Sequence, residues 1–278
     1  SYSPGLTKLT GLSAITTVGA LLIAGNDGLT TLDGLQGITT LGGGLSIIDN
    51  QALTTLEGLD QLTSIGDALT IRGNDALTSV EGMPNLAAVG SLVIDENPAL
   101  TTLAGLDLLT NIPTNLWLKD SETLRELDAL SNLTAVGGDL TITRLPLLED
   151  VDALSSLLSA GKLTVGGNEL LGDLDGLASV TTLDALNLWG LPLVVHLDGL
   201  SNLSTVGTVA LGSMDALENL DGLSGLSAVD GYLSIYEMPV LSDIGGLENL
   251  IFIGGDLSIR DNDSLANIDA LAGVTAIG

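Results

Sequence analysis

Apolar and polar positions repeat along this chain with a period of 23 or 24 residues. The segment Leu45–Gly66 has the pattern L-x-I-x-x-N-x-x-L-x-x-L-x-G-L-x-x-L-T-x-I-G, and Leu69–Met83 begins it again. The first residue of the repeat recurs at Leu21, Leu45, Leu69, Leu92, Leu116, Leu140, Leu163, Leu186, Val209, Leu233 and Leu257. An unbroken period of this length indicates a solenoid, in which each repeat forms one turn and neighbouring turns share a core.

Each part of the repeat predicts a short element. The opening L-x-I alternates inward and outward positions, as a strand does. The run L-x-x-L-D-G-L predicts a bend or a short 3₁₀ turn. The run L-T-x-I predicts a second extended segment, ending at a glycine that tolerates a positive φ. We therefore expect an all-β, parallel β-solenoid of about eleven turns, forming a single domain over residues 1–278.

A lone turn of this kind cannot fold. Burying about seven apolar side chains per turn contributes on the order of 10–20 kcal/mol. Ordering the backbone costs ~1–2 kcal/mol for each residue of the turn, which is larger in sum. Stacking adds hydrogen bonds between turns and completes the core, which explains why the unit repeats.

An asparagine follows the L-x-I run in six repeats, at Asn26, Asn50, Asn74, Asn97, Asn168 and Asn262. Inside a solenoid, this amide can bond the unpaired backbone groups of the corners above and below it. The column is interrupted at Ser121, Leu145, Leu191, Met214 and Met238. Because an apolar side chain cannot make these bonds, we expect a different corner at the interruptions.

The motif L-x-I-x-x-N-x-x-L-x-x-L-x-G-L, most complete at Leu21–Leu35 and Leu45–Leu59, resembles the receptor L-domain repeats. These leucine-rich solenoid repeats occur in the ligand-binding ectodomains of insulin and epidermal growth factor receptors, and in bacterial and fungal surface proteins. The resemblance covers nearly the whole chain and implies a right-handed solenoid that binds ligand on a sheet face. The lack of cysteine and the larger number of turns differ from the receptor domains and favour a bacterial-type surface protein.

Composition narrows the classes of function. With 35 acidic and 7 basic residues, the net charge of −28 repels nucleic-acid phosphates and anionic lipids, so we expect no nucleic-acid partner. No apolar run approaches the roughly 18 residues of a membrane span, so we expect no membrane insertion. Without cysteine and with one histidine, disulfides and Cys- or His-rich zinc sites are excluded. We expect an extracellular or cell-surface location, where ions screen the charge.

The two ends of the chain lie at similar phases of the repeat. The chain starts at Ser1-Tyr2-Ser3-Pro4 and stops at Ile277-Gly278, and neither end carries a polar cap. We expect either a fragment of a longer repeat protein or self-association through uncapped ends.

Candidate catalytic groups are sparse. The single histidine, His196, lies in an outward column that otherwise holds Thr31, Thr55, Thr102, Asp150, Asp173 and Asn219. A histidine without a nucleophile or an orienting partner does not define a catalytic site. We expect a solvated surface residue, a protein that is not an enzyme, and no cofactor.

An acidic column follows the second apolar run, at Asp33, Glu57, Glu81, Asp128, Asp152, Asp175, Asp198, Asp221 and Asp269. We interpret these residues as caps of the short helical turns that follow. A calcium-binding solenoid is the alternative, with Asp152, Asp175, Asp198 and Asp221 as candidate ligands, although the glycine-rich calcium nonapeptide is absent.

Repeated pairs such as Thr54-Thr55 suit strand surfaces, with an ice-binding lattice as a further alternative.

The outward positions of the L-x-I strands predict a binding face. Its candidate residues are Arg72, Trp117, Lys119, Trp189, Tyr236 and Arg260, which include both tryptophans of the chain. Trp, Tyr and Arg on one face are typical of interaction hot spots. We expect the rings to stack on a sugar or a partner side chain, and the cations to meet acidic groups.

These features predict a non-catalytic extracellular binding or adhesion module for a protein or glycan ligand. The structural alternative is a solenoid that stacks end to end into a fibre or surface layer.

Overall fold

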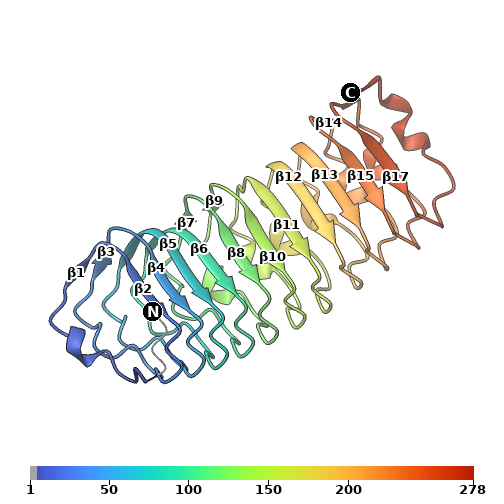
Figure 1. Cartoon of the computed structure of the whole chain (residues 1–278). Helices are drawn as coiled ribbons and strands as arrows, with labels where there is room; N and C mark the ends of the chain where they lie inside the picture. The colour runs from blue at the N-terminus through green and yellow to red at the C-terminus, as the bar shows by residue number, and fades with distance from the viewer. Residues whose placement is uncertain (1–4) are drawn as a thin grey trace. The chain divides into compact units, whose positions relative to one another are not determined.

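The computed structural model describes residues 5–278, which form two compact units that divide between Gly138 and Asp139. We call them unit 1 and unit 2. In each unit, short parallel strands from successive turns lie side by side (Figure 1). The only helices among the described residues are short 3₁₀ turns. The predicted parallel β-solenoid of about eleven turns is therefore confirmed.

Unit 1 winds through five L-x-I strands. Its elements are η1 (Thr10–Leu12), β1 (Thr17–Val18), β2 (Leu21–Ala24), β3 (Thr40–Leu41), β4 (Leu45–Ile48), β5 (Ser64–Arg72), β6 (Ala88–Asp95), β7 (Asn111–Ile112), β8 (Leu116–Lys119), η2 (Asp128–Leu130) and β9 (Ala135–Val136). The L-x-I run occupies β2, β4, β8 and the second halves of β5 and β6. Its first residues pair in order, as Leu21, Leu45, Leu69, Leu92 and Leu116.

Unit 2 repeats the arrangement with a 3₁₀ turn in each circuit. Its elements are β10 (Leu140–Thr143), η3 (Asp152–Leu154), β11 (Lys162–Gly166), η4 (Asp175–Leu177), β12 (Thr182–Trp189), η5 (Asp198–Leu200), β13 (Thr205–Gly212), η6 (Asp221–Leu223), β14 (Ala228–Val229), β15 (Leu233–Tyr236), η7 (Gly245–Leu247), β16 (Phe252–Ile253), β17 (Leu257–Arg260), η8 (Asp269–Gly273) and β18 (Ala276–Ile277). The L-x-I strands β10, β11, β12, β13, β15 and β17 pair in parallel without a slip.

The core of both units is aliphatic. Every buried hydrophobic side chain of the described residues is Leu, Ile, Val, Met or Ala. Neighbouring turns lie only ~4.8 Å apart, so each inward side chain packs on its counterpart in the next turn. A ring in one turn would need a matching gap in its neighbour, whereas branched aliphatic chains stack without one. The aromatic side chains that the structure describes are therefore left on the surface.

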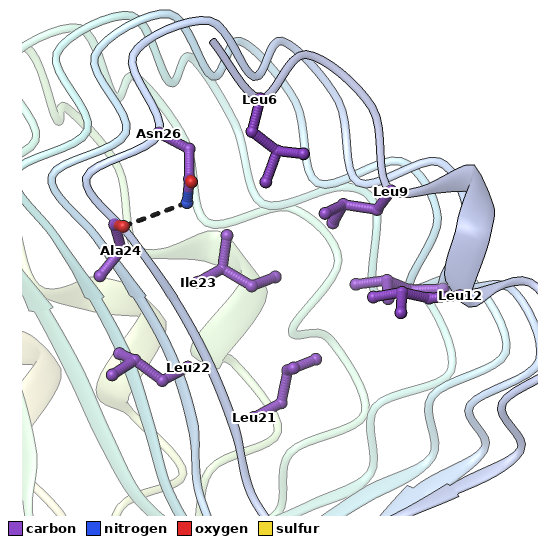
Figure 2. A pocket seen from close by; sticks show the side chains of 9 residues that line it. Leu6, Leu9, Leu12, Leu21, Leu22, Ile23, Ala24 and Asn26 are labelled. Carbon is purple, nitrogen blue, oxygen red and sulfur yellow. Dashed lines mark hydrogen bonds between the residues drawn. The ribbon is translucent and has the colours of Figure 1, made fainter. Parts of the chain in front are cut away.

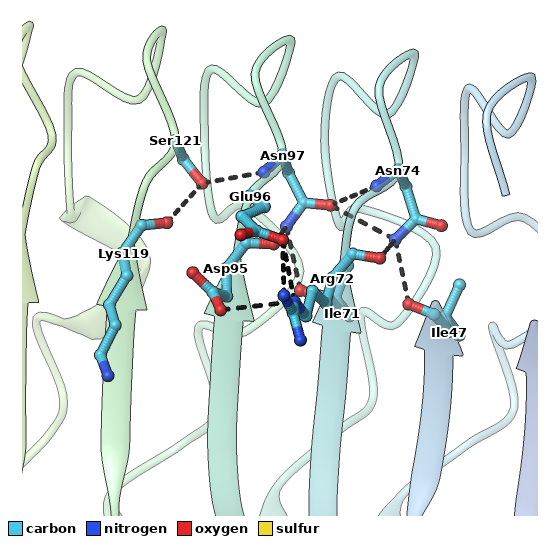
Figure 3. Close-up of polar contacts among 9 residues, drawn as sticks. All are labelled: Ile47, Ile71, Arg72, Asn74, Asp95, Glu96, Asn97, Lys119 and Ser121. Carbon is cyan, nitrogen blue, oxygen red and sulfur yellow. Dashed lines mark hydrogen bonds and ion pairs between the residues drawn. The ribbon is translucent and has the colours of Figure 1, made fainter. Parts of the chain in front are cut away.

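Buried asparagines hydrogen-bond the corner after four of the five L-x-I strands of unit 1, and Figure 3 shows Asn74 and Asn97. The Nδ2 of Asn74 donates to the carbonyls of Ile47 and Arg72, both at 3.0 Å, and its Oδ1 accepts from the backbone N–H of Asn50 at 3.1 Å. Asn97 makes the same set of bonds one turn further on. One amide thus bonds three backbone groups, two in the preceding turn and one in its own turn.

The interruptions of the asparagine column keep the same corner, so the expectation of a different corner is wrong. The residue before each column position is left-handed, with φ between 47° and 64° at Gly25, Asp49, Gly73, Glu96, Asp120, Arg144, Gly167, Gly190, Ser213, Glu237 and Asp261. The backbone N–H of this residue bonds the next turn, as Ser213 N does to the carbonyl of Tyr236 at 3.1 Å. The ladder between turns sets the corner, and the amide only adds bonds to it.

Replacing Asn74 with alanine is expected to lower the free energy of unfolding by about 2–4 kcal/mol, because the buried Asn50 N–H loses its acceptor and the Ile47 and Arg72 carbonyls each lose a bond. Urea unfolding followed by far-UV circular dichroism measures the change. The control is Asn85→Ala, since the exposed Asn85 amide donates one bond to the Asp60 carbonyl. Equal stabilities of the two variants would contradict the role given to the buried amide.

Replacing Gly190 with alanine is expected to cost about 1–2 kcal/mol, because a Cβ is strained at its φ of 60°. The nearest atom to that Cβ would be the Gly167 nitrogen, at 3.3 Å. Gly172→Ala is the matched control, because Gly172 has no positive φ and its Cβ would meet only the Glu149 carbonyl oxygen, at 3.9 Å. Thermal unfolding compares them, and equal melting temperatures would argue against corner strain.

Candidate ligand-binding face

The outward side chains of the L-x-I strands form a continuous face in each unit, which we call the L-x-I face. In unit 1 the register aligns one column of Leu22, Ser46, Thr70, Val93 and Trp117, and another of Ala24, Ile48, Arg72, Asp95 and Lys119. In unit 2 the columns are Thr141, Thr164, Asn187, Ala210, Ser234 and Ser258, and Thr143, Gly166, Trp189, Gly212, Tyr236 and Arg260. The six candidate residues thus divide between the units, three on each.

A third column of this face was missed by sequence reasoning. The residue before each L-x-I run also points outward, which the strand alternation could have indicated. It adds Lys162, in register with Ala185, and Tyr232, which is 43% exposed. Of the five aromatic residues that the structure describes, only Phe252 lies off the face. Four of the seven basic residues of the chain lie on it: Arg72, Lys119, Lys162 and Arg260.

The unit 1 cations of the face have partners within the chain. The Arg72 guanidinium pairs with the Glu96 carboxylate at 2.8 Å and lies 3.6 Å from Asp95 Oδ2 (Figure 3). The Glu96 bond and the two carboxylate charges raise the pKa of Arg72. The Lys119 ammonium lies 4.1 Å from the ring centroid of Trp117, a cation–π contact. A ligand would therefore replace existing contacts rather than meet unpaired charges.

Asp95 lies between these cations, since it is in register with both Arg72 and Lys119. Its Oδ1 is buried and accepts no hydrogen bond from the described residues. Partial burial, followed by the charges of Glu96 and Asp120, raises the pKa of Asp95, and the two cations offset part of the rise.

The unit 2 rings rest on glycines of the preceding turn. A Cβ built on Gly166 would lie 2.2 Å from Trp189 Cε2, and one on Gly212 would lie 2.2 Å from Tyr236 Cζ. The Arg260 guanidinium carbon lies 4.6 Å from the Tyr236 ring centroid, and its Nη1 is 3.1 Å from Asp261 Oδ2. Alternation of glycine and ring keeps the aromatic side chains close to the sheet.

An apolar cavity of about 200 Å³ lies beside β2 in unit 1 (Figure 2). Its lining is Leu6, Leu9, Leu12, Leu21, Leu22, Ile23, Ala24, Asn26 and Leu35. Most of these side chains belong to columns that fill the core in later turns. No charged side chain lines the cavity, so it offers no group for acid–base or nucleophilic chemistry.

The acidic column does not cap the 3₁₀ turns through its side chains, which corrects that interpretation. Asp152 and Asp175 begin η3 and η4, but their own backbone N–H groups are bonded by the carboxylates of Asp150 and Asp173, at 3.1 and 3.0 Å. The capping side chain stands two residues earlier, at Thr31, Thr55, Thr102, Asp150, Asp173, Asn219, Asp243 and Asn267. A side-chain acceptor two residues before a backbone N–H forms an Asx or ST turn.

His196 belongs to this capping column. The His196 Nδ1 atom lies 3.4 Å from Asp198 Oδ2. This nitrogen atom is buried and makes no hydrogen bond to the described residues. The side chain is 40% exposed rather than fully solvated. His196 therefore occupies a position that in other repeats holds a turn-capping side chain.

The acidic side chains of η3 and η4 lie close enough to interact. Burial, followed by the charges of Asp150, Asp173 and Asp175, raises the pKa of Asp152. The described residues contain no group of three or more His, Cys, Asp or Glu side chains placed to hold a metal ion. Calcium binding by Asp152, Asp175, Asp198 and Asp221 stays a prediction.

The repeated L-x-I turns, the stacked parallel strands and the aliphatic core define a leucine-rich-repeat-like β-solenoid. No protein-family model and no curated protein matches the sequence. Within the described residues, no helix is long and apolar enough to cross a bilayer.

Solved structures include similar chains. An internalin from Listeria monocytogenes is similar over 94% of this chain and 86% of its own, with 19% identity and a TM-score of 0.48. A complex of TLR13 with ssRNA13 is similar over 96% of this chain and 63% of its own, with 15% identity and a TM-score of 0.20.

Asp95→Asn tests the burial of this carboxylate. A raised folded pKa means that the native state binds more protons than the unfolded state between the ordinary carboxyl value and the folded value. This carboxyl therefore lowers wild-type stability as the pH rises through that window, and the variant lacks this contribution. Because the Asp95 carboxyl is partly exposed, its contribution is reduced by solvent screening. Across this pH window, we expect the free energy of unfolding of the wild type to fall relative to that of the variant by a few tenths of a kcal/mol, about half or less of a typical ion pair. Urea unfolding from about pH 3 to pH 7 measures it; parallel profiles would contradict the account.

Proposed function

We propose that this protein is a non-catalytic binding module that recognises its ligand with the L-x-I face. The observation that carries the proposal is the distribution of aromatic side chains. The core holds none among its described residues, and four of the five described rings lie on this one face. Since packing does not require these rings, recognition is the function that best accounts for them.

The arrangement of the rings supports the same proposal. Trp117 and Tyr236 each lie beside a cation of the face, and Trp189 rests on glycine backbone. Rings held in this way lose little conformational freedom when a ligand binds, which lowers the cost of association. The face is also built on strands rather than loops, which makes its geometry rigid.

We propose an extracellular or cell-surface location for this module. The net charge of −28 favours surroundings in which salt and divalent ions screen self-repulsion. A chain without cysteine gains nothing from an oxidising environment but is not harmed by it. The ligand in such a setting is a protein or a glycan, and the same charge disfavours nucleic acid.

The double variant Trp117→Ala, Trp189→Ala is expected to lose at least about tenfold in ligand affinity, because one aromatic anchor is removed from each unit. Wild type and variant are compared on arrays of defined glycans and purified proteins, with far-UV circular dichroism to check the fold. Phe252→Ala is the matched control, because this ring is 40% exposed but lies off the face. Equal capture by wild type and the double variant would refute the proposed face.

A further inference from the structure

Trp189 lies flat on the sheet of unit 2. A Cβ on Gly166 would be 2.2, 2.5 and 2.5 Å from Trp189 Cε2, Cδ2 and Nε1. Three ring atoms at nearly equal distances place that Cβ beneath the ring plane rather than beside a ring edge. Gly167, the next residue, lies under the far end of the indole, with Cζ3 at 3.1 Å from its own ideal Cβ. The indole is therefore supported on one side by bare backbone.

Tyr236 repeats this geometry two turns further along the same column. A Cβ on Gly212 would be 2.2, 2.3 and 2.5 Å from its Cζ, Cε2 and Cε1, again beneath the ring. At a strand spacing of ~4.8 Å, the two rings are roughly 10 Å apart along the solenoid. Arg260 lies over Tyr236, so the guanidinium offers hydrogen-bond donors beside the ring.

The column next to Trp189 and Tyr236 is made of small side chains, all of them polar except Ala210. It holds Thr141, Thr164, Asn187, Ala210, Ser234 and Ser258, without one large apolar residue. With its amide oriented to satisfy its neighbours, Asn187 accepts from Lys162 Nζ at 3.2 Å and donates to the Leu186 carbonyl. This row of hydroxyl and amide groups runs parallel to the rings.

We propose that the L-x-I face of unit 2 binds a neutral glycan, with a pyranose ring stacked on the indole of Trp189. The inference rests on the proposed function and names the ligand class for this face. The C–H side of a pyranose ring is flat and weakly apolar, which suits a flat indole, while its hydroxyl edge suits Thr, Ser and Asn side chains. Tyr236, with the Arg260 guanidinium over its ring, lies further along the same column and offers polar contacts to the next sugar units, which favours an extended oligosaccharide over a single sugar.

Charge and shape favour this ligand over the other candidates. The net charge of −28 repels uronic, sialic or sulfated sugars, whereas a neutral sugar meets no such barrier. A protein partner typically inserts aromatic or aliphatic anchors into apolar pockets. The unit 2 columns present glycine, hydroxyl and amide groups to such anchors, and their large apolar surface is the rings alone.

The test uses the full chain carrying Trp117→Phe, which leaves Trp189 as its single tryptophan. Its emission is followed while neutral hexasaccharides of β-1,4-linked glucose, N-acetylglucosamine or mannose are added, with oligogalacturonate as the anionic probe. We expect a saturable blue shift with at least one neutral sugar, because stacking excludes water from the indole. The affinity should change less than about twofold between low and high salt, since no charge is neutralised.

Variants locate the site. In the wild-type background, isothermal titration with the sugar that binds should show at least a tenfold loss in Trp189→Ala and partial retention in Trp189→Tyr, which keeps a flat ring. Phe252→Ala should bind as wild type does.

The possible outcomes separate this inference from the proposed function. If no neutral sugar shifts the Trp189 emission but an arrayed protein is captured through Trp117 and Trp189, the glycan inference is wrong and the binding face stands. If oligogalacturonate binds best and loses affinity with salt, the neutral class is wrong. If neither array yields a ligand dependent on these residues, both proposals are wrong.

Discussion

The in-register stacking of one turn on the next is the constraint on which the rest of this structure depends. A parallel ladder allows only ~4.8 Å between equivalent residues, so whatever stands at one inward position must pack on its counterpart. Leucine, isoleucine and valine meet this condition in every turn. The same spacing lets one buried amide, such as that of Asn74, reach backbone groups of its own turn and of the turn before it. The core and its polar column are thus two results of a single geometry.

The constraint on the inside leaves the outside free to vary. Outward positions of the L-x-I strands need only tolerate an extended backbone, and they differ in character between the units. In unit 1, the ion pairs of Arg72 lie beside the cation–π pair of Lys119 and Trp117. In unit 2, glycine positions such as Gly166 make room for flat rings among small hydroxyl side chains. One scaffold can therefore present two distinct chemistries, and this separation motivates assigning a ligand class to unit 2 by itself.

Much of the fold was predictable because the same pattern of apolar and polar positions recurs in every turn. Period, strand position and the inward columns all follow from the recurrence of Leu45 and its equivalents. Corner geometry did not follow, since residues as different as Gly190 and Glu237 adopt the same left-handed φ under the control of the ladder between turns. The capping acceptor was also misplaced by two residues, because sequence alone does not show that Asp150 bonds the N–H of Asp152. Of the candidate face, the columns were predictable but the tilt of Trp189 onto Gly166 was not, because it depends on side-chain rotamer.

A core that holds no aromatic ring among residues 5–278 changes what spectroscopy can detect in this protein. Both tryptophans and the two tyrosines that the structure describes lie on the outer surface of the strands, so their signals report the exposure of that surface rather than the integrity of the interior. An emission change during denaturation would mark the release of a side chain such as Trp189 from its glycine support, and it need not coincide with loss of the ladder. Comparing fluorescence with amide-based signals would therefore separate surface loosening from unwinding of the coil.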